Sequence, residues 1–127
     1  MKYYSLPMEK SPKLVFDLNN GVIKILGRST MARPQDFYPS VIHLVEEYCE
    51  NPNQSTRLII DLEYYNSLSS RFLLRIVELI SKIDLKRNHE VSIDWHYDPA
   101  DKGIAEDISM FSKIIHFRIN AIAYELA

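Results

Sequence analysis

Apolar residues recur along the chain with two different periods. Short stretches in which apolar and polar residues alternate, or in which apolar residues run together, predict strands. They lie at residues 13–17, 22–27, 57–63, 90–97 and 116–124. Longer stretches with apolar residues three or four positions apart predict amphipathic helices. These begin near Pro34, Ser67 and Asp98 and end near residues 51, 86 and 115.

The order of these elements predicts one α/β domain. A turn at Leu18–Gly21 joins the first two strands into an antiparallel hairpin, after which helices and strands alternate. The order β-β-α-β-α-β-α-β implies a mixed sheet with right-handed crossovers. We expect the domain to span residues 13–127, with residues 1–12 as an N-terminal tail. A chain of 127 residues, 46% of them hydrophobic, can bury such a core.

Composition excludes several classes of function. The net charge is −2, from 15 basic and 17 acidic side chains, whereas a nucleic-acid-binding domain is usually clearly basic. The single Cys49 excludes an intramolecular disulfide, and the 3 glycines form no phosphate-binding loop. No signal peptide is recognisable, and no apolar run approaches the roughly 20 residues that span a bilayer. We expect a cytoplasmic protein with no membrane insertion.

Side chains that could support catalysis are scattered along the sequence. His43 and Glu47 are four residues apart, but the histidines show no zinc-binding spacing. The carboxylates of Asp94, Asp98 and Asp101 could bind a divalent cation, so a metal-dependent enzyme is one alternative. Acidic residues at the start of a helix more simply stabilise the helix dipole. Since no nucleophile motif appears either, we predict neither an enzyme nor a cofactor.

The most informative segment is the junction between the central predicted strand and the helix that follows it. The strand ends in Tyr64-Tyr65, and Asn66 then leads into a run of hydroxyl residues, Ser67, Ser69 and Ser70. Asn and Ser oxygens accept hydrogen bonds from the first N–H groups of a helix, so the simplest interpretation is a helix cap. One hydroxyl suffices for capping, however, and a phosphate at this place would be stabilised by the helix dipole. Phosphorylation is therefore a second interpretation, and spacing alone leaves the acceptor open.

Aromatic residues end two neighbouring predicted strands. Tyr65 closes one strand and Trp95 and Tyr97 close the next. In a parallel arrangement both groups reach the carboxyl edge of the sheet, where sites are usual in α/β proteins. Aromatic side chains there favour a protein-binding surface near Tyr65 and Tyr97, with either Tyr64 or Tyr65 buried. A pocket at the same place would instead indicate a module that senses a small molecule or nucleotide.

A series of short motifs occurs in a characteristic order. They are Phe16-Asp17 with Gly21-Val22-Ile23, Gly27-Arg28-Ser29, Phe37-Tyr38-Pro39 with Tyr48 and Pro52, the segment from Glu63 to Arg71, and Trp95-x-Tyr97-Asp98. Together they resemble the SiaC family of biofilm-regulation phosphoproteins over nearly the whole chain after residue 12. The resemblance implies a STAS-like domain similar to anti-sigma-factor antagonists.

The resemblance also implies a regulatory cycle without catalysis by the chain itself. A partner kinase phosphorylates the hydroxyl residue that follows the Asn, and a serine/threonine phosphatase removes the phosphate. The unphosphorylated form binds and activates a diguanylate cyclase, which raises cyclic di-GMP. The family threonine corresponds to Ser67 here, so the resemblance selects Ser67 as the acceptor, with Ser69 and Ser70 as alternatives.

Residues around Ser67 are assigned roles on the same basis. Asn66 is expected to shape the turn, and Ser69 and Ser70 to cap the helix. Leu68 stands where the family has a serine, and Arg71 replaces a lysine and could pair with the phosphate. The predicted partner-binding residues are Tyr65, Asn66, Leu68, Arg71 and Tyr97.

Overall fold

The computed structural model describes residues 2–5 and 10–125, with side chains from residue 10 onward. Its strands are β1 (Lys2–Ser5), β2 (Lys13–Asp17), β3 (Val22–Ser29), β4 (Ser55–Tyr65), β5 (Glu90–Tyr97) and β6 (Asn120–Ala123). Its helices are η1 (Pro34–Asp36), α1 (Tyr38–Glu50), α2 (Ser67–Ser81), η2 (Lys82–Leu85) and α3 (Lys102–Ile115). From β2 onward the major elements follow the predicted order.

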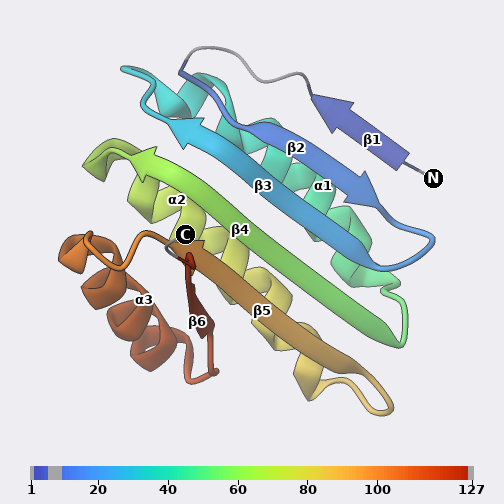
Figure 1. The fold of residues 1–127 in the computed structure, drawn as a ribbon. Helices are drawn as coiled ribbons and strands as arrows, with labels where there is room; N and C mark the ends of the chain where they lie inside the picture. Colours follow the sequence, from blue (N-terminus) through green and yellow to red (C-terminus); the bar gives the residue numbers. More distant parts are fainter. Residues whose placement is uncertain (1, 6–9, 126–127) are drawn as a thin grey trace.

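The strands form one mixed sheet in the order β1-β2-β3-β4-β5-β6 (Figure 1). The pairs β1/β2 and β2/β3 are antiparallel, while β3/β4, β4/β5 and β5/β6 are parallel. A helix connects the two strands of each parallel pair, because parallel neighbours need a crossover from one end of the sheet to the other. The prediction of a single α/β domain with a mixed sheet is confirmed.

Two predicted boundaries differ from the structure. The predicted N-terminal tail, 1–12, contains β1, which pairs antiparallel with β2; residues 6–9 of that tail lie outside the described residues. The last predicted strand, 116–124, is shortened to β6. Its first residues instead end α3, because His116 adopts a left-handed conformation (φ 54) and Phe117 N–H donates to the Ser112 carbonyl.

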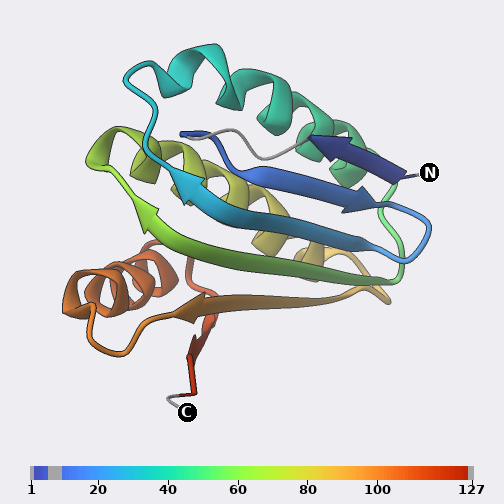
Figure 2. The ribbon, with the colours of Figure 1, turned by 45° about the horizontal axis from the view of Figure 1, so that its top comes forward.

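The core lies between the sheet and the helices on one of its faces, as Figure 2 shows for α1 and α2. Alternate residues of the central strands point into it, and one broad stripe of α2 covers them. These buried side chains include Ile23, Ile25, Leu58, Ile60, Leu62, Ile93, Trp95, Leu73, Ile76, Val77 and Ile80. The intervening strand residues, such as Lys24, Arg57 and Asp61, face the other side of the sheet.

The alternation along β4 is interrupted near its end. Gly27 of β3 lies opposite Leu62, but the next residue, Arg28, lies opposite Tyr64, so Glu63 is an extra residue in β4. Because successive strand residues point to opposite faces, the extra residue exchanges the faces of all that follow. Tyr65 therefore points into the core, and its register partner Ser29 is buried beside it.

Gly21 allows the β2–β3 turn to approach β4 closely. Its φ is +67, its carbonyl accepts a hydrogen bond from Arg57 N–H at 2.7 Å, and a Cβ added there would lie 2.2 Å from the Ser55 carbonyl oxygen. Only glycine fits both the conformation and the contact.

We expect Gly21→Ala to lower the free energy of unfolding by roughly 2–4 kcal/mol, because backbone strain adds to a clash with backbone. Urea denaturation measures the change. Gly27→Ala is the control, since Gly27 also has a positive φ (103) but nothing within 4 Å of an added Cβ. It should cost only about 1 kcal/mol. Equal costs at the two positions would show that the close approach to Ser55 is unimportant.

Candidate functional site

Asn66 caps the N-terminus of α2. Its backbone is extended (φ −86, ψ 168), and its side-chain Oδ1 accepts a hydrogen bond from Ser69 N–H at 3.0 Å. Its Nδ2 donates to the Met31 carbonyl at 3.0 Å, and its backbone N–H donates to the Ser29 carbonyl at 3.0 Å. The cap therefore ties the start of α2 to the end of β3 and the loop that follows.

The three candidate serines occupy three different environments. Ser67, the first residue of α2, is exposed, and among the described residues no hydrogen bond holds its hydroxyl. Ser69 is 0% exposed. Ser70 is half-buried, and its hydroxyl donates to the Ser67 carbonyl at 2.8 Å. The expectation that Ser69 and Ser70 cap the helix is wrong, since Asn66 makes the cap.

Four side chains form a buried hydrogen-bonded chain under Ser67. We call Tyr38, Ser29, Ser69 and Asn66 the hydroxyl chain. Ser29 Oγ donates to Ser69 Oγ at 2.9 Å, and Ser69 Oγ donates to Asn66 Oδ1 at 2.8 Å. The Ser29 hydroxyl has one proton, which it donates to Ser69. In the short hydrogen bond between Ser29 Oγ and Tyr38, the Tyr38 hydroxyl is therefore the donor. Tyr38 and Ser29 thus each donate toward Ser69, whose single proton has two acceptors within reach: Asn66 Oδ1, the nearer, and the Ser29 carbonyl at 3.1 Å.

The environment of Tyr38 keeps that donor protonated. Burial raises the pKa of Tyr38 to about 12, more than its hydrogen bonds to Ser29 and Ser69 lower it. The phenol is therefore neutral throughout the physiological range. The Ser69 N–H and the Met31 carbonyl fix the amide of Asn66, with its oxygen toward α2 and its nitrogen toward Met31, and the Ser69 hydroxyl bonds the same oxygen.

An aromatic stack supports the outer side of the same helix turn. The Tyr38 ring lies on the Phe72 ring, with centroids 5.3 Å apart and planes at 10°, and Phe37 meets its edge. The Arg71 guanidinium lies 4.8 Å above the Phe72 ring. Arg71 is exposed and follows Ser67 by four residues, so the two side chains project from the same side of the helix.

The two tyrosines before Asn66 have opposite environments. Tyr65 is 8% exposed, contacts Trp95 and donates from its hydroxyl to Asp107 Oδ2 at 2.6 Å. Burial, together with that hydrogen bond, raises the pKa of Tyr65. Tyr64 is 54% exposed. Of the two tyrosines, one of which was expected to be buried, Tyr65 is the core residue, because the register shift in β4 exchanges the two faces; its predicted place on a partner-binding surface does not fit this burial.

The other predicted contact residues lie partly or fully at the surface. Leu68 is 50% exposed, which is unusual for a leucine in a helix that otherwise buries its apolar side chains. Tyr97 is half-buried and packs against the core. Leu68 and Arg71 are therefore the exposed predicted contact residues that lie in α2 with Ser67.

The acidic residues proposed for a metal site are used separately. Asp94 is bound by Arg57 Nη2 at 2.9 Å and by Asn120 Nδ2 at 2.9 Å, while Asp98 and Asp101 accept backbone N–H groups of Ala100 and Ile104. Within the part of the chain that the structure describes, no group of three His, Cys, Asp or Glu residues could hold a metal ion. Asp94 links β5 to β4 and β6, whereas Asp98 bonds within the turn that follows β5 and Asp101 caps α3, so the geometry gives the metal alternative no support.

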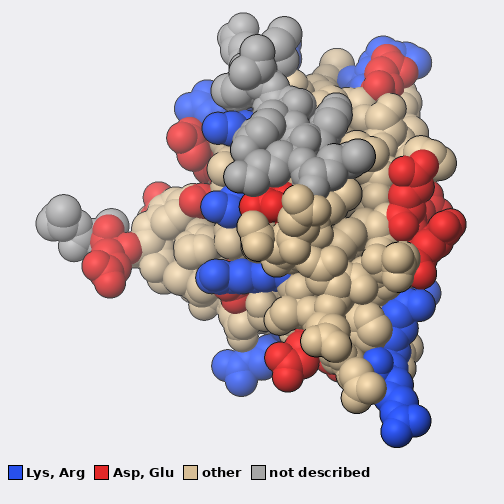
Figure 3. All heavy atoms as spheres, turned by 90° about the vertical axis from the view of Figure 1, so that its right-hand side faces the viewer, with Lys and Arg blue, Asp and Glu red and all other residues tan. Residues whose placement is uncertain are grey.

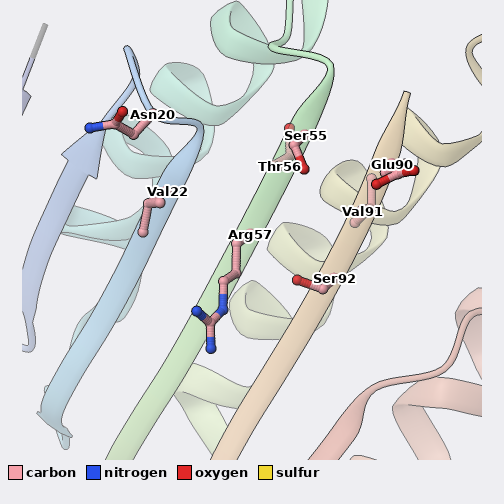
Figure 4. Close-up of a pocket in the computed structure, with 8 residues that line it drawn as sticks. All are labelled: Asn20, Val22, Ser55, Thr56, Arg57, Glu90, Val91 and Ser92. Carbon is pink, nitrogen blue, oxygen red and sulfur yellow. The ribbon is translucent and has the colours of Figure 1, made fainter. Parts of the chain in front are cut away.

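The pocket in Figure 4 lies far from the candidate site. It has a volume of about 310 Å³ and is lined by Asn20, Val22, Ser55, Thr56, Arg57, Glu90, Val91 and Ser92. These residues surround the start of β4, whereas Ser67 follows its end, roughly 30 Å away along the strand. Neither Tyr65 nor Tyr97 lines this pocket, so it does not support a sensing pocket at the predicted place.

The distribution of surface charge agrees with the near balance of 15 basic and 17 acidic residues in the sequence. Acidic and basic side chains form small separate groups on the side shown in Figure 3, without a continuous field of one sign. No helix in the described residues is long and apolar enough to cross a membrane.

Comparison with known proteins decides the family. The family model described as "SiaC family regulatory phosphoprotein" matches residues 7–124. The chain belongs to the SiaC family. The resemblance inferred from the sequence motifs is confirmed, and with it the assignment to a family of regulatory phosphoproteins.

Solved structures of the SiaC family share the fold of this chain. Apo-SiaC from Pseudomonas aeruginosa has a TM-score of 0.83 and 22% identity, covering 97% of this chain and 99% of that one. SiaC in the crystal structure of its complex with the diguanylate cyclase SiaD, also from Pseudomonas aeruginosa, has a TM-score of 0.84 and 22% identity; 96% of this chain and 99% of that one are covered. An uncharacterized protein of Pseudomonas aeruginosa (strain UCBPP-PA14) is 24% identical over 98 residues, 77% of each chain.

The cap predicts a local loss of stability when Asn66 is replaced in this SiaC-family chain. We expect Asn66→Ala to lower the free energy of unfolding by about 1–2 kcal/mol, because the Met31 carbonyl loses its donor and the Ser69 N–H loses its side-chain acceptor and keeps only the backbone carbonyl of residue 66. Ser70→Ala, which removes a hydroxyl bonded within the same helix turn, should cost under about 0.5 kcal/mol. Chemical denaturation of both variants measures this, and equal losses would contradict the assigned cap.

Asp94 predicts a pH-dependent contribution to stability. Burial would raise the pKa of Asp94, but hydrogen bonds from Asn120 and Arg57 outweigh it and hold the pKa below its ordinary value. The folded state therefore binds this proton less readily than the unfolded chain, whose Asp pKa is about 4. The stabilisation is complete above that pKa and is lost as the pH falls through the lower pKa of the folded state.

We expect Asp94→Asn to lower the free energy of unfolding by about 1–2 kcal/mol at pH 7, after allowance for the half-exposed Arg57, with the difference shrinking toward pH 3. Urea denaturation from pH 3 to pH 7 measures it. Glu63→Gln removes the exposed carboxylate that binds Arg28 and should change little at either pH. A difference for Asp94→Asn that stays constant with pH would contradict the assignment.

Proposed function

We propose that this chain is a non-enzymatic regulator switched by phosphorylation of Ser67. In this proposal a partner kinase adds the phosphate, a partner phosphatase removes it, and the unphosphorylated form binds and activates a diguanylate cyclase. The observation that carries the choice of acceptor is the contrast between exposed Ser67 and fully buried Ser69. A kinase can reach the first hydroxyl without unfolding the helix and cannot reach the second.

The cyclase as partner is supported by a relative. SiaC of Pseudomonas aeruginosa is described as the activator of the diguanylate cyclase SiaD, with which it forms a solved complex. A cytoplasmic location is part of the proposal, because the kinase must take its phosphate from a nucleoside triphosphate. The proposed contact surface consists of Leu68 and Arg71 around Ser67; Tyr65 is buried and is no part of it.

Electrostatics explains how one phosphate could prevent binding without unfolding the protein. A phosphoserine adds about −1.5 to −2 charges. At the N-terminus of α2 that charge is stabilised by up to ~1–2 kcal/mol, and Arg71 lies one turn away. A partner that covers Leu68 would instead bury the charge, which costs several kcal/mol; ~3 kcal/mol already weakens binding more than a hundredfold.

Phosphosite mapping in the native host tests the acceptor. We expect intact-mass and tandem mass spectrometry to find a single phosphate on Ser67, absent from Ser67→Ala and retained in Ser70→Ala. The Ser70 control has a hydroxyl in the same turn, so it separates loss of the acceptor from disturbance of the helix. A phosphate on Ser69 would place the switch elsewhere, and no phosphate under any growth condition would refute phosphorylation as the switch.

Binding of the two forms to the host's diguanylate cyclase tests the consequence. The form with phosphoserine at 67 should bind at least a hundredfold more weakly than the unphosphorylated form, while its melting temperature stays within a few degrees. Equal affinities for the cyclase would overturn the proposed output while leaving the modification itself in place.

A further inference from the structure

We infer that Tyr38 is the positioning residue of the phosphorylation site, acting on both sides of Ser67 from a fully buried place. This inference rests on the proposed function, because it concerns how the acceptor is held. Tyr38 is the first residue of α1 and is 0% exposed, so it touches neither solvent nor a partner. Its effect on Ser67 must pass through other residues.

The hydroxyl of Tyr38 acts on the residue that precedes Ser67. Among the described residues it is the donor that begins the hydroxyl chain, because the proton of Ser29 is directed to Ser69 and the proton of Ser69 to Asn66 Oδ1 or the Ser29 carbonyl. Aligned hydroxyls polarise one another, and a buried acceptor left without its donor is costly. Through Ser29 and Ser69, the Tyr38 hydroxyl therefore supports the amide of Asn66, which the Ser69 N–H and the Met31 carbonyl also hold and which fixes where the backbone of Ser67 enters the helix.

The ring of Tyr38 acts on the residue one turn after Ser67. It stacks on Phe72, which packs against the core and also lies under the guanidinium of Arg71. Arg71 is thus held over an aromatic surface instead of extending freely into solvent, and no carboxylate in the described part of the chain forms an ion pair with it. One buried side chain orients both Asn66 and Arg71, the two groups that flank the acceptor hydroxyl.

The same helix provides a matched control at its opposite end. Tyr48 is also a buried tyrosine of α1, and its hydroxyl bonds Thr56 Oγ1 at 2.7 Å near the start of β4. Tyr38→Phe and Tyr48→Phe each remove one buried tyrosine hydroxyl and keep the ring. They should have similar costs in stability, but only Tyr38→Phe alters the surroundings of Ser67.

The experiment measures phosphate gain on purified chains in extract of the native host supplied with ATP. We expect the initial rate of phosphate incorporation at Ser67, followed by intact mass, to fall at least fivefold in Tyr38→Phe and to stay within twofold of wild type in Tyr48→Phe. Amide hydrogen exchange of Ser69, whose N–H donates to Asn66, should quicken at least tenfold in Tyr38→Phe alone. This second measurement needs no kinase.

The possible outcomes distinguish a failure of the proposed function from a failure of the positioning role of Tyr38. Wild-type protein that gains no phosphate at Ser67 would refute the proposed function itself. Wild-type protein that gains phosphate, with a Tyr38→Phe rate within twofold of it, would overturn only the positioning role. Equal losses of rate in both variants would also overturn that role, because they would reduce the effect to general stability. Rate loss confined to Tyr38→Phe, together with faster exchange at Ser69, would establish it.

Discussion

The parallel pairing of β3 with β4 is the constraint on which the candidate site depends. Parallel strands end at the same edge of a sheet, so Ser29 at the end of β3 lies beside Asn66, which follows β4. The crossover through α1 begins at that same edge and places Tyr38 there as well. Residues from three distant parts of the sequence thus meet at the start of α2, and the meeting point is buried.

The position of the extra residue Glu63 shows where sequence periodicity fails. Leu58, Ile60 and Leu62 point inward, and strict alternation would continue with Tyr64 inward and Tyr65 outward. The sequence left open which of the two tyrosines is buried, and the predicted role of Tyr65 in partner binding would have required it on the surface. A register shift depends on how two strands pair, here beside Gly27 in β3, and the sequence of one strand does not contain it. The strands and helices themselves follow from their periods because each buries one regular face.

The choice between Ser67 and Ser69, in contrast, could have been made from the sequence. Two residues along a helix turn it by about 200°, so the two hydroxyls must point in nearly opposite directions. Ser69 precedes Leu73 by four residues and Ile76 by seven, which places it on the buried stripe of α2. The distance of each serine from the cap does not show which hydroxyl a kinase could reach. The spacing from the apolar stripe does, because it assigns Ser69 to the interior. The hydroxyl chain needs contacts between distant segments and could not have been foreseen in this way.

This geometry also determines what kind of switch a phosphate could produce. At Ser69 the phosphate would lie inside the hydroxyl chain, against the Ser29 carbonyl and Asn66 Oδ1, which accept hydrogen bonds from Ser69 Oγ and have no proton to offer a phosphate. A buried charge without a counter-charge would disrupt the cap, and the switch would operate by local unfolding. At Ser67 the phosphate would remain in solvent at the positive end of α2, with the hydroxyl chain intact beneath it. A phosphate on Ser67 would therefore change the charge of this surface without changing its shape, because the buried hydrogen bonds beneath it are not disturbed.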